Sequence, residues 1–313
     1  MRRLVVGLLL SEAGQGFRQF YPHYRMALAH WLAENFDFSP TTLARVVKRN
    51  LRKRKEDDRK FLQLLRKRLY ADYQQAGERP TLLEEVAKLV ECASNGSGNG
   101  GLYRIVNFNF DDLLERELRK SDIRARPVYS EESCLRDELE VLHPHGFLPR
   151  TGQIPAQELV FTEDEYHKLS LQPFNWATTE LASMLRNSVC LFVGLSMTDP
   201  NLRRMLDACR GRDRKVRHYV IRRDYDVANI DLDDAVAQVQ TRAEHEGQRR
   251  RCTKQREPQE KSARGVRGAI QQMLKQAHTY DRQLLSELRV GAIWVRDFDD
   301  MPNLLRALID YDD

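Results

Sequence analysis

The chain has few cysteines, and those it has are not paired along the sequence. Five cysteines are scattered over 313 residues, and no two of them form a Cys-x-x-Cys motif. The sequence therefore encodes no zinc ribbon and no disulfide framework. We expect no bound metal and a reducing, cytoplasmic location. The five cysteines are Cys92, Cys134, Cys190, Cys209 and Cys252.

Long apolar runs are also absent. No segment approaches the roughly 20 consecutive apolar residues that a membrane-spanning helix requires, so we expect no membrane partner. The segment Met1–Leu10 has two arginines followed by a short apolar stretch, as signal peptides do. No small-residue cleavage site follows it, and we interpret it as a buried first strand.

Charge is plentiful but unevenly distributed. Hydrophobic residues make up 41% and charged residues 31%, which is typical of a globular protein with a polar surface. The net charge is only +5, yet residues 41–70 carry twelve Lys and Arg against three Asp and Glu. A second basic cluster spans residues 249–256. Such a helical face can bind nucleic acid, but more often it is the solvated side of a helix. Both interpretations remain open.

The first third of the chain has a helical pattern. Ser39-Pro40 is a helix start, and Phe61, Leu65 and Leu69 share one face of the following helical segment. A capping box at residues 81–84 opens another helix, and the Gly- and Ser-rich stretch 94–101 reads as a linker. Residues 20–101 are therefore expected to form a helical subdomain.

From residue 102 onward the pattern alternates between strands and helices. That alternation predicts an α/β fold, Rossmann-like, with a mostly parallel sheet, helices on both faces and the helical subdomain inserted into it. Strands are expected at residues 102–106, 140–143, 158–161, 188–193, 216–221 and 290–295. Helices are expected at 111–119, 175–185, 200–209 and 301–309, with a short one capped by 162–165.

These segments divide the chain into five parts. Residues 1–19 supply the first strand and loop of the α/β domain, and residues 20–101 the helical subdomain. Residues 102–223 form the main α/β domain, 224–289 a polar helical insertion, and 290–313 the last strand and helix.

The segment Leu191–Leu202 is the most informative one. An apolar strand ends in Gly-x-Ser and enters a helix at Asp-Pro-Asn. Gly194 lets a backbone approach a ligand closely, and Ser196 offers a hydroxyl. Asp199 and Pro200 suit the N-cap and the first helical position. Open α/β sheets bind nucleotides at such strand ends, although an ordinary strand-to-helix turn would also have this pattern.

Two other strand ends carry polar residues. Asn109 follows the strand 102–106, and Asp111 can cap the next helix, although turn and cap roles are the usual ones for these residue types. His145 precedes Gly146 after the strand 140–143. An imidazole there can act as a base near neutral pH, whereas a lone histidine is more often structural.

In this order, the three segments resemble the sirtuin-like (SIR2-like) family, most closely its zinc-less branch in bacterial anti-phage proteins that hydrolyse NAD. The Thr-x-Asn-Tyr-Asp-like motif of that branch corresponds to residues 107–111, and its His-Gly motif to His145-Gly146. Its Gly-x-Ser-x-x-Asp-x-Asn motif corresponds to residues 194–201. Residues 161–166 and 297–302 are also similar to the corresponding sequence segments of such proteins. The resemblance covers residues 102–221 and 290–313.

The resemblance implies NAD as substrate and no metal. Asn109 would contact the nicotinamide ribose or position the attacking water, and His145 would act as base toward a ribose hydroxyl. The bond cleaved would join the ribose anomeric carbon to nicotinamide, through an oxocarbenium-like transition state. Further NAD-binding residues would be Gly7, Ser11, Asp111, Gly194, Ser196, Asp199 and Asn201.

The N-terminal loop departs from the family pattern. The family has Gly-Ala-Gly-x-Ser there, whereas this chain has Gly7-Leu8-Leu9-Leu10-Ser11. A leucine at a close-approach position should clash with the phosphates of NAD. The loop binds differently, the true start lies upstream, or the protein no longer turns over NAD.

The leading hypothesis is an NAD hydrolase in anti-phage defence, held inactive until a partner protein or a homo-oligomer switches it on. A catalytically degenerate module that binds NAD or ADP-ribose is the first alternative, and a nucleic-acid-binding protein using the basic face is the second. NAD-dependent protein deacylation ranks lower, because the zinc-binding cysteine pairs of deacylases are missing.

Overall fold

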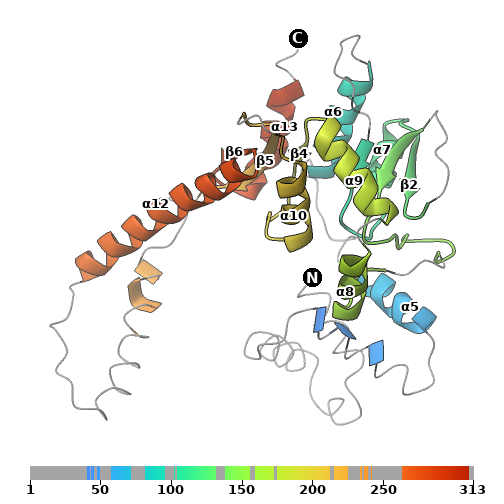
Figure 1. Ribbon diagram of the computed structural model, residues 1–313, viewed down its shortest axis with the longest axis horizontal. Helices are drawn as coiled ribbons and strands as arrows, with labels where there is room; N and C mark the ends of the chain where they lie inside the picture. The colour runs from blue at the N-terminus through green and yellow to red at the C-terminus, as the bar shows by residue number, and fades with distance from the viewer. Residues whose placement is uncertain are drawn as a thin grey trace. The chain divides into compact units, whose positions relative to one another are not determined.

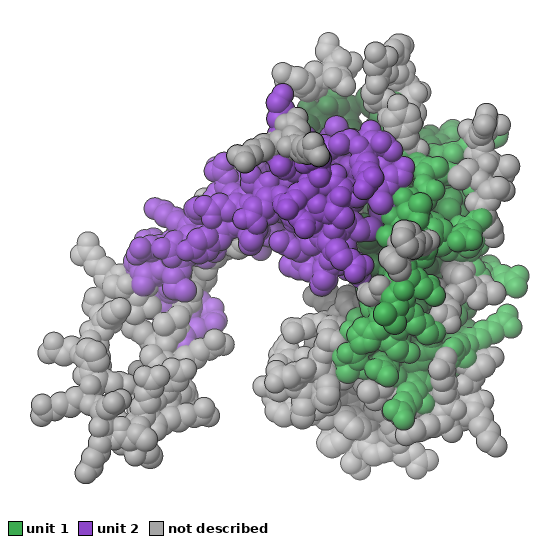
Figure 2. All heavy atoms as spheres, in the orientation of Figure 1, with its two compact units in different colours: residues 1–180, 305–313 green, residues 181–304 purple. Residues whose placement is uncertain are grey.

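The computed structural model describes residues 58–71, 82–95, 104–131, 138–155, 159–172, 175–211, 215–224 and 263–309, with single positions in 41–49, at 102 and in 233–241. They belong to two compact units (Figure 2). Unit 1 comprises residues 1–180 and 305–313, and unit 2 comprises residues 181–304. The expected first strand, the Gly7–Ser11 loop and the helix start at Ser39-Pro40 lie outside the described residues.

Unit 1 contains a three-stranded parallel sheet. Its strands are β1 (Arg104–Val106), β2 (Ala125–Val128) and β3 (Leu139–Leu142), in the order β1-β3-β2. Ile105 and Pro127 both pair with Val141 in the central strand. Strand β2 was not expected from the sequence, because Ala-Arg-Pro-Val contains a proline. Pro127 is tolerated there because β2 is an edge strand in this sheet.

Unit 1 also contains helices, most of them with a buried apolar face. They are α5 (Asp58–Leu69), α6 (Leu82–Asn95), α7 (Leu113–Lys120), α8 (Glu163–Leu171) and the first part of α9 (Trp176–Asn187). The expected face of α5 is confirmed: Phe61 and Leu65 are buried, and Leu69 packs against their cluster. Each such side chain contributes about 1.5–3 kcal/mol on burial. Two clusters result, one with Phe110, Leu148, Leu159 and Phe161 around α5, the other with Ala87, Val90, Leu114, Leu118 and Val141.

The expected strand at residues 158–161 is wrong. Residues 159–161 form no strand, and the backbone N–H groups of Phe161 and Thr162 instead donate to Glu165 Oε2, at 2.9 and 2.7 Å. Because Glu165 is the third residue of α8, this is the capping box that the sequence predicted at residues 162–165. A backbone donor held by a carboxylate is not available to a strand ladder.

Unit 2 has its own three-stranded parallel sheet, in the order β4-β5-β6. The strands are β4 (Leu191–Phe192), β5 (His218–Arg223) and β6 (Val290–Val295). Strand β4 is shorter than the expected 188–193, whereas β6 has the expected bounds. Parallel strands connected through helices confirm the predicted α/β class.

The helices of unit 2 follow the sequence pattern closely. Helix α10 (Pro200–Cys209) has the expected bounds. Helix α13 (Met301–Ile309) begins as expected after the short 3-10 helix η3 (Phe298–Asp300), and its residues from Leu305 onward belong to unit 1. Within the polar insertion, α12 (Ala263–Glu287) runs for 25 residues and leads into β6 (Figure 1). None of the described helices is both long and apolar enough to cross a bilayer.

Candidate functional site

The polar loops after β1 and β3 lie at one edge of the unit 1 sheet, because neighbouring parallel strands end at the same edge. The backbone N–H of Asn107 donates to Leu142 O at 2.8 Å, and that of His143 donates to Val128 O at 2.7 Å. These bonds extend the pairing past the strands. The structure therefore places Asn109 and His145 after strands, as the sequence predicted, and shows that these two strands are adjacent.

Asn109 lies in a turn that the side chain of Asn107 stabilises. Its backbone N–H donates to Asn107 Oδ1 at 3.0 Å, which is an Asx-turn. The Asn109 side chain is exposed and makes no hydrogen bond to any described residue. Its amide therefore points to where a ligand could reach it.

Asp111 caps the helix that follows, but as the residue before the N-cap. Its Oδ1 accepts a hydrogen bond from Leu113 N at 3.2 Å, while Asp112 occupies the N-cap position. Burial raises the pKa of Asp111, and the nearby Glu115 carboxylate raises it further. The predicted cap is therefore displaced by one residue, because the N-cap is Asp112 and Asp111 holds Leu113 N from the position before it. A role of Asp111 in NAD binding remains a prediction.

His145 is surrounded by aromatic rings. The ring centroids of Phe108, Phe110 and Tyr166 lie 5.4, 6.4 and 5.4 Å from that of its imidazole. Phe108 and Phe110 flank Asn109 in the chain, so the two candidate catalytic residues share this part of unit 1. Gly146 has φ +93°, in the left-handed region that favours glycine, which explains the His-Gly pair.

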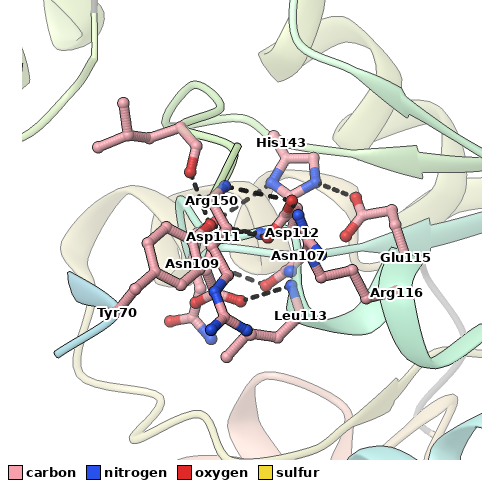
Figure 3. A network of polar contacts seen from close by, with 11 residues as sticks. Tyr70, Asn107, Asn109, Asp111, Asp112, Leu113, Glu115, Arg116, His143 and Arg150 are labelled. Atoms are coloured by element: carbon pink, nitrogen blue, oxygen red, sulfur yellow. Dashed lines mark hydrogen bonds and ion pairs between the residues drawn. The ribbon is translucent and has the colours of Figure 1, made fainter. Parts of the chain in front are cut away.

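A second histidine, His143, directly follows β3 and is buried beneath these loops. Its side chain is fully buried, with Nδ1 2.9 Å from Asn109 O and Nε2 2.6 Å from Glu115 Oε1 (Figure 3). The sequence interpretation overlooked this pair. The sequence gives no clear signal for it, because only the structure shows that Glu115 of α7 is buried and that its carboxylate therefore requires a partner.

The Gly-x-Ser segment of unit 2 forms the expected turn. Gly194 has φ +69°, and Met197 also adopts a left-handed conformation. Ser196 is exposed, its Oγ lies 2.7 Å from Thr198 Oγ1, and its carbonyl accepts a hydrogen bond from Arg222 Nη1 at 2.8 Å. Arg222 is in turn paired with Asp281 of α12 at 2.7 Å.

Asp199 is the N-cap of α10. Its Oδ1 accepts hydrogen bonds from Asn201 N at 2.8 Å and Leu202 N at 2.9 Å, and Pro200 takes the first helical position. The capping prediction is therefore confirmed. Ligand contacts by Gly194, Ser196, Asp199 and Asn201 remain predictions.

The predicted site residues fall into three groups. Asn109, Asp111 and His145 belong to unit 1, and the four residues of the 194–201 segment belong to unit 2. Gly7 and Ser11 lie outside the described residues. Among the residues that the structure describes, no three His, Cys, Asp or Glu side chains are grouped as metal ligands.

Part of the chain matches a known protein family. The model of the SIR2-like domain matches residues 104–245, a range that includes all three strand-end motifs. No curated protein matches the sequence significantly. The SIR2-like family includes NAD-dependent enzymes. From the start of β1 to beyond the end of β5, the chain therefore matches the model of a SIR2-like domain.

Proposed function

We propose that this protein hydrolyses NAD to nicotinamide and ADP-ribose. One observation carries the proposal: within the SIR2-like domain, an exposed Asn109 and a half-buried His145 lie in adjacent strand-end loops. Cleavage of the bond between nicotinamide and ribose develops positive charge on the ribose. The protein must therefore orient NAD and stabilise that charge, for which polar groups on fixed loops are suited.

In this proposal Asn109 orients the ribose or the attacking water through its side-chain amide. His145 accepts a proton from a ribose hydroxyl, and the rings of Phe108, Phe110 and Tyr166 restrict the orientation of its imidazole.

The remaining contacts to NAD would come from other loops. Gly194 and Ser196 would approach the rest of the dinucleotide, and Gly7 and Ser11 its pyrophosphate. Asp199 Oδ1 already accepts two backbone hydrogen bonds. We therefore assign Asp199 the task of shaping the Gly194–Asp199 turn, with Asn201 beside it.

The test is nicotinamide release by the purified full chain, followed by chromatography. Asn109→Ala and His145→Ala should each lower turnover by about 10²-fold or more, the usual contribution of a positioned acid–base group. His167→Ala and Asn187→Ala, at exposed positions on α8 and α9, are the matched controls and should keep full activity. Activity that survives both Asn109→Ala and His145→Ala would refute these roles.

One sequence feature favours a second function. Leu8 and Leu9 replace small residues in the N-terminal loop, which would suit a module that binds NAD or ADP-ribose without cleaving it. Thermal stabilisation by ADP-ribose, with NAD left intact, would favour that module. Release of acetate from an acetyl-lysine peptide would instead indicate a deacylase.

A role in anti-phage defence extends the main proposal. NAD depletion would halt an infected cell, so the activity would need a partner protein or an oligomer switch. Cellular NAD in expressing bacteria, measured before and after infection, tests this role. An unchanged NAD level in infected cells carrying the active protein would argue against it.

A further inference from the structure

We propose that His143 and Glu115 form a buried clamp that fixes the main chain of Asn109, which makes His143 a positioning residue for NAD cleavage. The clamp joins three elements: Glu115 on α7, His143 after β3, and Asn109 after β1 (Figure 3). Its effect on turnover rests on the proposed function, whereas its hydrogen-bonding pattern does not.

The hydrogen bonds define how many protons the pair holds. A carbonyl oxygen can only accept, so His143 Nδ1, at 2.9 Å from Asn109 O, must carry a hydrogen. Nε2 and Glu115 Oε1, at 2.6 Å, must also have a hydrogen between them. Without it, two lone pairs would face each other. The pair is thus imidazolium with carboxylate, or imidazole with carboxylic acid, and is neutral overall in both forms.

Because the His143–Glu115 pair is buried, its two members bind each other and not water. The exposed fraction of His143 is 0% and that of Glu115 is 3%, so water does not compete for either group. Among the described residues, Glu115 Oε2 has no hydrogen-bond partner, which leaves His143 as the polar group that holds this carboxylate. Hydrogen bonds to ionised groups in a dry interior are short and strong.

The clamp fixes Asn109 from one side while Asn107 fixes it from the other. Asn107 Oδ1 holds the Asn109 N–H at 3.0 Å, and His143 holds the Asn109 carbonyl. With both peptide groups held, the Cα–Cβ bond of Asn109 has a fixed direction. The side chain has no hydrogen bond of its own to a described residue, so the backbone contacts set the point from which its amide reaches a ligand.

The two histidines of the His-Pro-His-Gly segment therefore have different tasks. His145 lies among aromatic rings beside the exposed amide, whereas His143 points inward, with the Phe147 ring centroid 4.8 Å from its own. Phe110 O also accepts a hydrogen bond from Leu148 N at 2.7 Å, independently of His143. Loss of His143 should therefore displace the Asn109 peptide and leave the loop tethered.

Kinetics of the full chain with NAD test the clamp. His143→Phe, which removes the donor, should lower kcat by about 10- to 100-fold and leave KM within about twofold, as expected when a reacting group is misplaced. Glu115→Ala should also lower kcat. Glu115→Gln should keep near-normal kcat, because its amide can donate to Nε2 while Nδ1–H still binds Asn109 O. His167→Phe is the matched control and should change neither parameter.

Histidine ¹⁵N NMR gives a readout that does not depend on activity. His143 Nδ1 should carry a slowly exchanging hydrogen in both wild type and Glu115→Gln. An Nδ1 lone pair, unchanged kcat in His143→Phe, or equal losses in Glu115→Ala and Glu115→Gln would overturn the clamp. Absence of nicotinamide release by the wild-type protein would instead count against the proposed function, while the Nδ1 result would still decide the clamp.

Discussion

The Tyr70 hydroxyl is hydrogen-bonded to both the backbone N–H and the side-chain carboxylate of Asp112. Asp112 N donates to Tyr70 Oη at 3.0 Å, while Tyr70 Oη lies 2.9 Å from Asp112 Oδ1 and 2.7 Å from Leu148 O. Burial raises the pKa of the Tyr70 phenol, so the hydroxyl keeps its hydrogen. Tyr70 directly follows α5, and Asp112 occupies the N-cap position of α7, so this contact fastens α5 to the loop that carries Asn109.

Tyr70→Phe should therefore destabilise unit 1. The substitution leaves the Asp112 N–H and two buried acceptors without their partner, at a cost of about 1–3 kcal/mol. Urea unfolding of the variant and wild type measures the difference. Tyr129→Phe is the matched control, because the Tyr129 ring stacks on Phe147 and its hydroxyl has no hydrogen bond to a described residue. Equal stability of the two variants would contradict the assignment.

Gly194→Ala should lower stability through the backbone alone. Nothing lies within 4 Å of the added Cβ, but φ is +69°, which costs an L-residue about 1–2 kcal/mol. Gly268→Ala is the control, because it should not lower stability. It lies in α12 with open space around it, so the change should be neutral or stabilise by about 0.5–1 kcal/mol. Thermal unfolding tests both, and a cost at Gly268 with none at Gly194 would contradict this account.

Substitutions of Asp199 should separate capping from ligand binding. Asp199→Ala removes the cap of α10 and should cost about 1 kcal/mol, whereas Asp199→Asn keeps an acceptor and should be nearly neutral. Denaturant unfolding gives both values, and Asp207→Ala, near the exposed end of the helix, is the control. If Asp199 also binds NAD directly, Asp199→Asn will raise KM without loss of stability.

His218 should make unit 2 sensitive to acid. Its Nδ1 accepts a hydrogen bond from Cys190 N at 3.2 Å, and burial, reinforced by the charge of Arg217, lowers its pKa. The unfolded chain then binds a proton at a higher pH than the folded one. Stability is therefore fully present above the ordinary histidine pKa, about 6.5, and falls as pH decreases below it.

The comparison variant for this prediction is His218→Gln, which offers an acceptor that does not titrate. Unfolding free energies of both proteins, measured between about pH 8 and pH 5, should diverge on the acid side, with wild type losing more. Parallel profiles would show that His218 does not titrate differently in the folded and unfolded states.

Elements with local signals could be predicted from the sequence. The bounds of α10 follow from Asp199-Pro200 at its start, and β6 follows from an apolar run between charged segments. Strand β2 depends on a partner strand elsewhere in the sequence, whereas the expected strand at 158–161 is replaced by a local contact. β2 exists because β3 pairs with it, and Phe161 is held by Glu165 rather than by another strand.

The candidate site likewise has residues that the sequence pattern predicts and residues that only the tertiary packing reveals. Strand-end residues such as Asn109 and His145 could be placed from the pattern, since parallel strands display their carboxyl ends at one edge. The partner of His143 could not, because Glu115 lies 28 residues away in the sequence and on a different element. Only the packing of α7 against the sheet reveals which carboxylate meets which imidazole.

The order of strands in unit 1 has a consequence for synthesis on the ribosome. β1 and β2 do not pair with each other, and both pair with β3, which comes last along the chain. During translation these two described strands must wait for β3 before either can form the pairing seen in the structure. Late, non-local pairing of this kind slows folding and leaves unpaired edges open to other nascent chains. Yield of native protein should therefore depend on chaperone supply and on the speed of elongation.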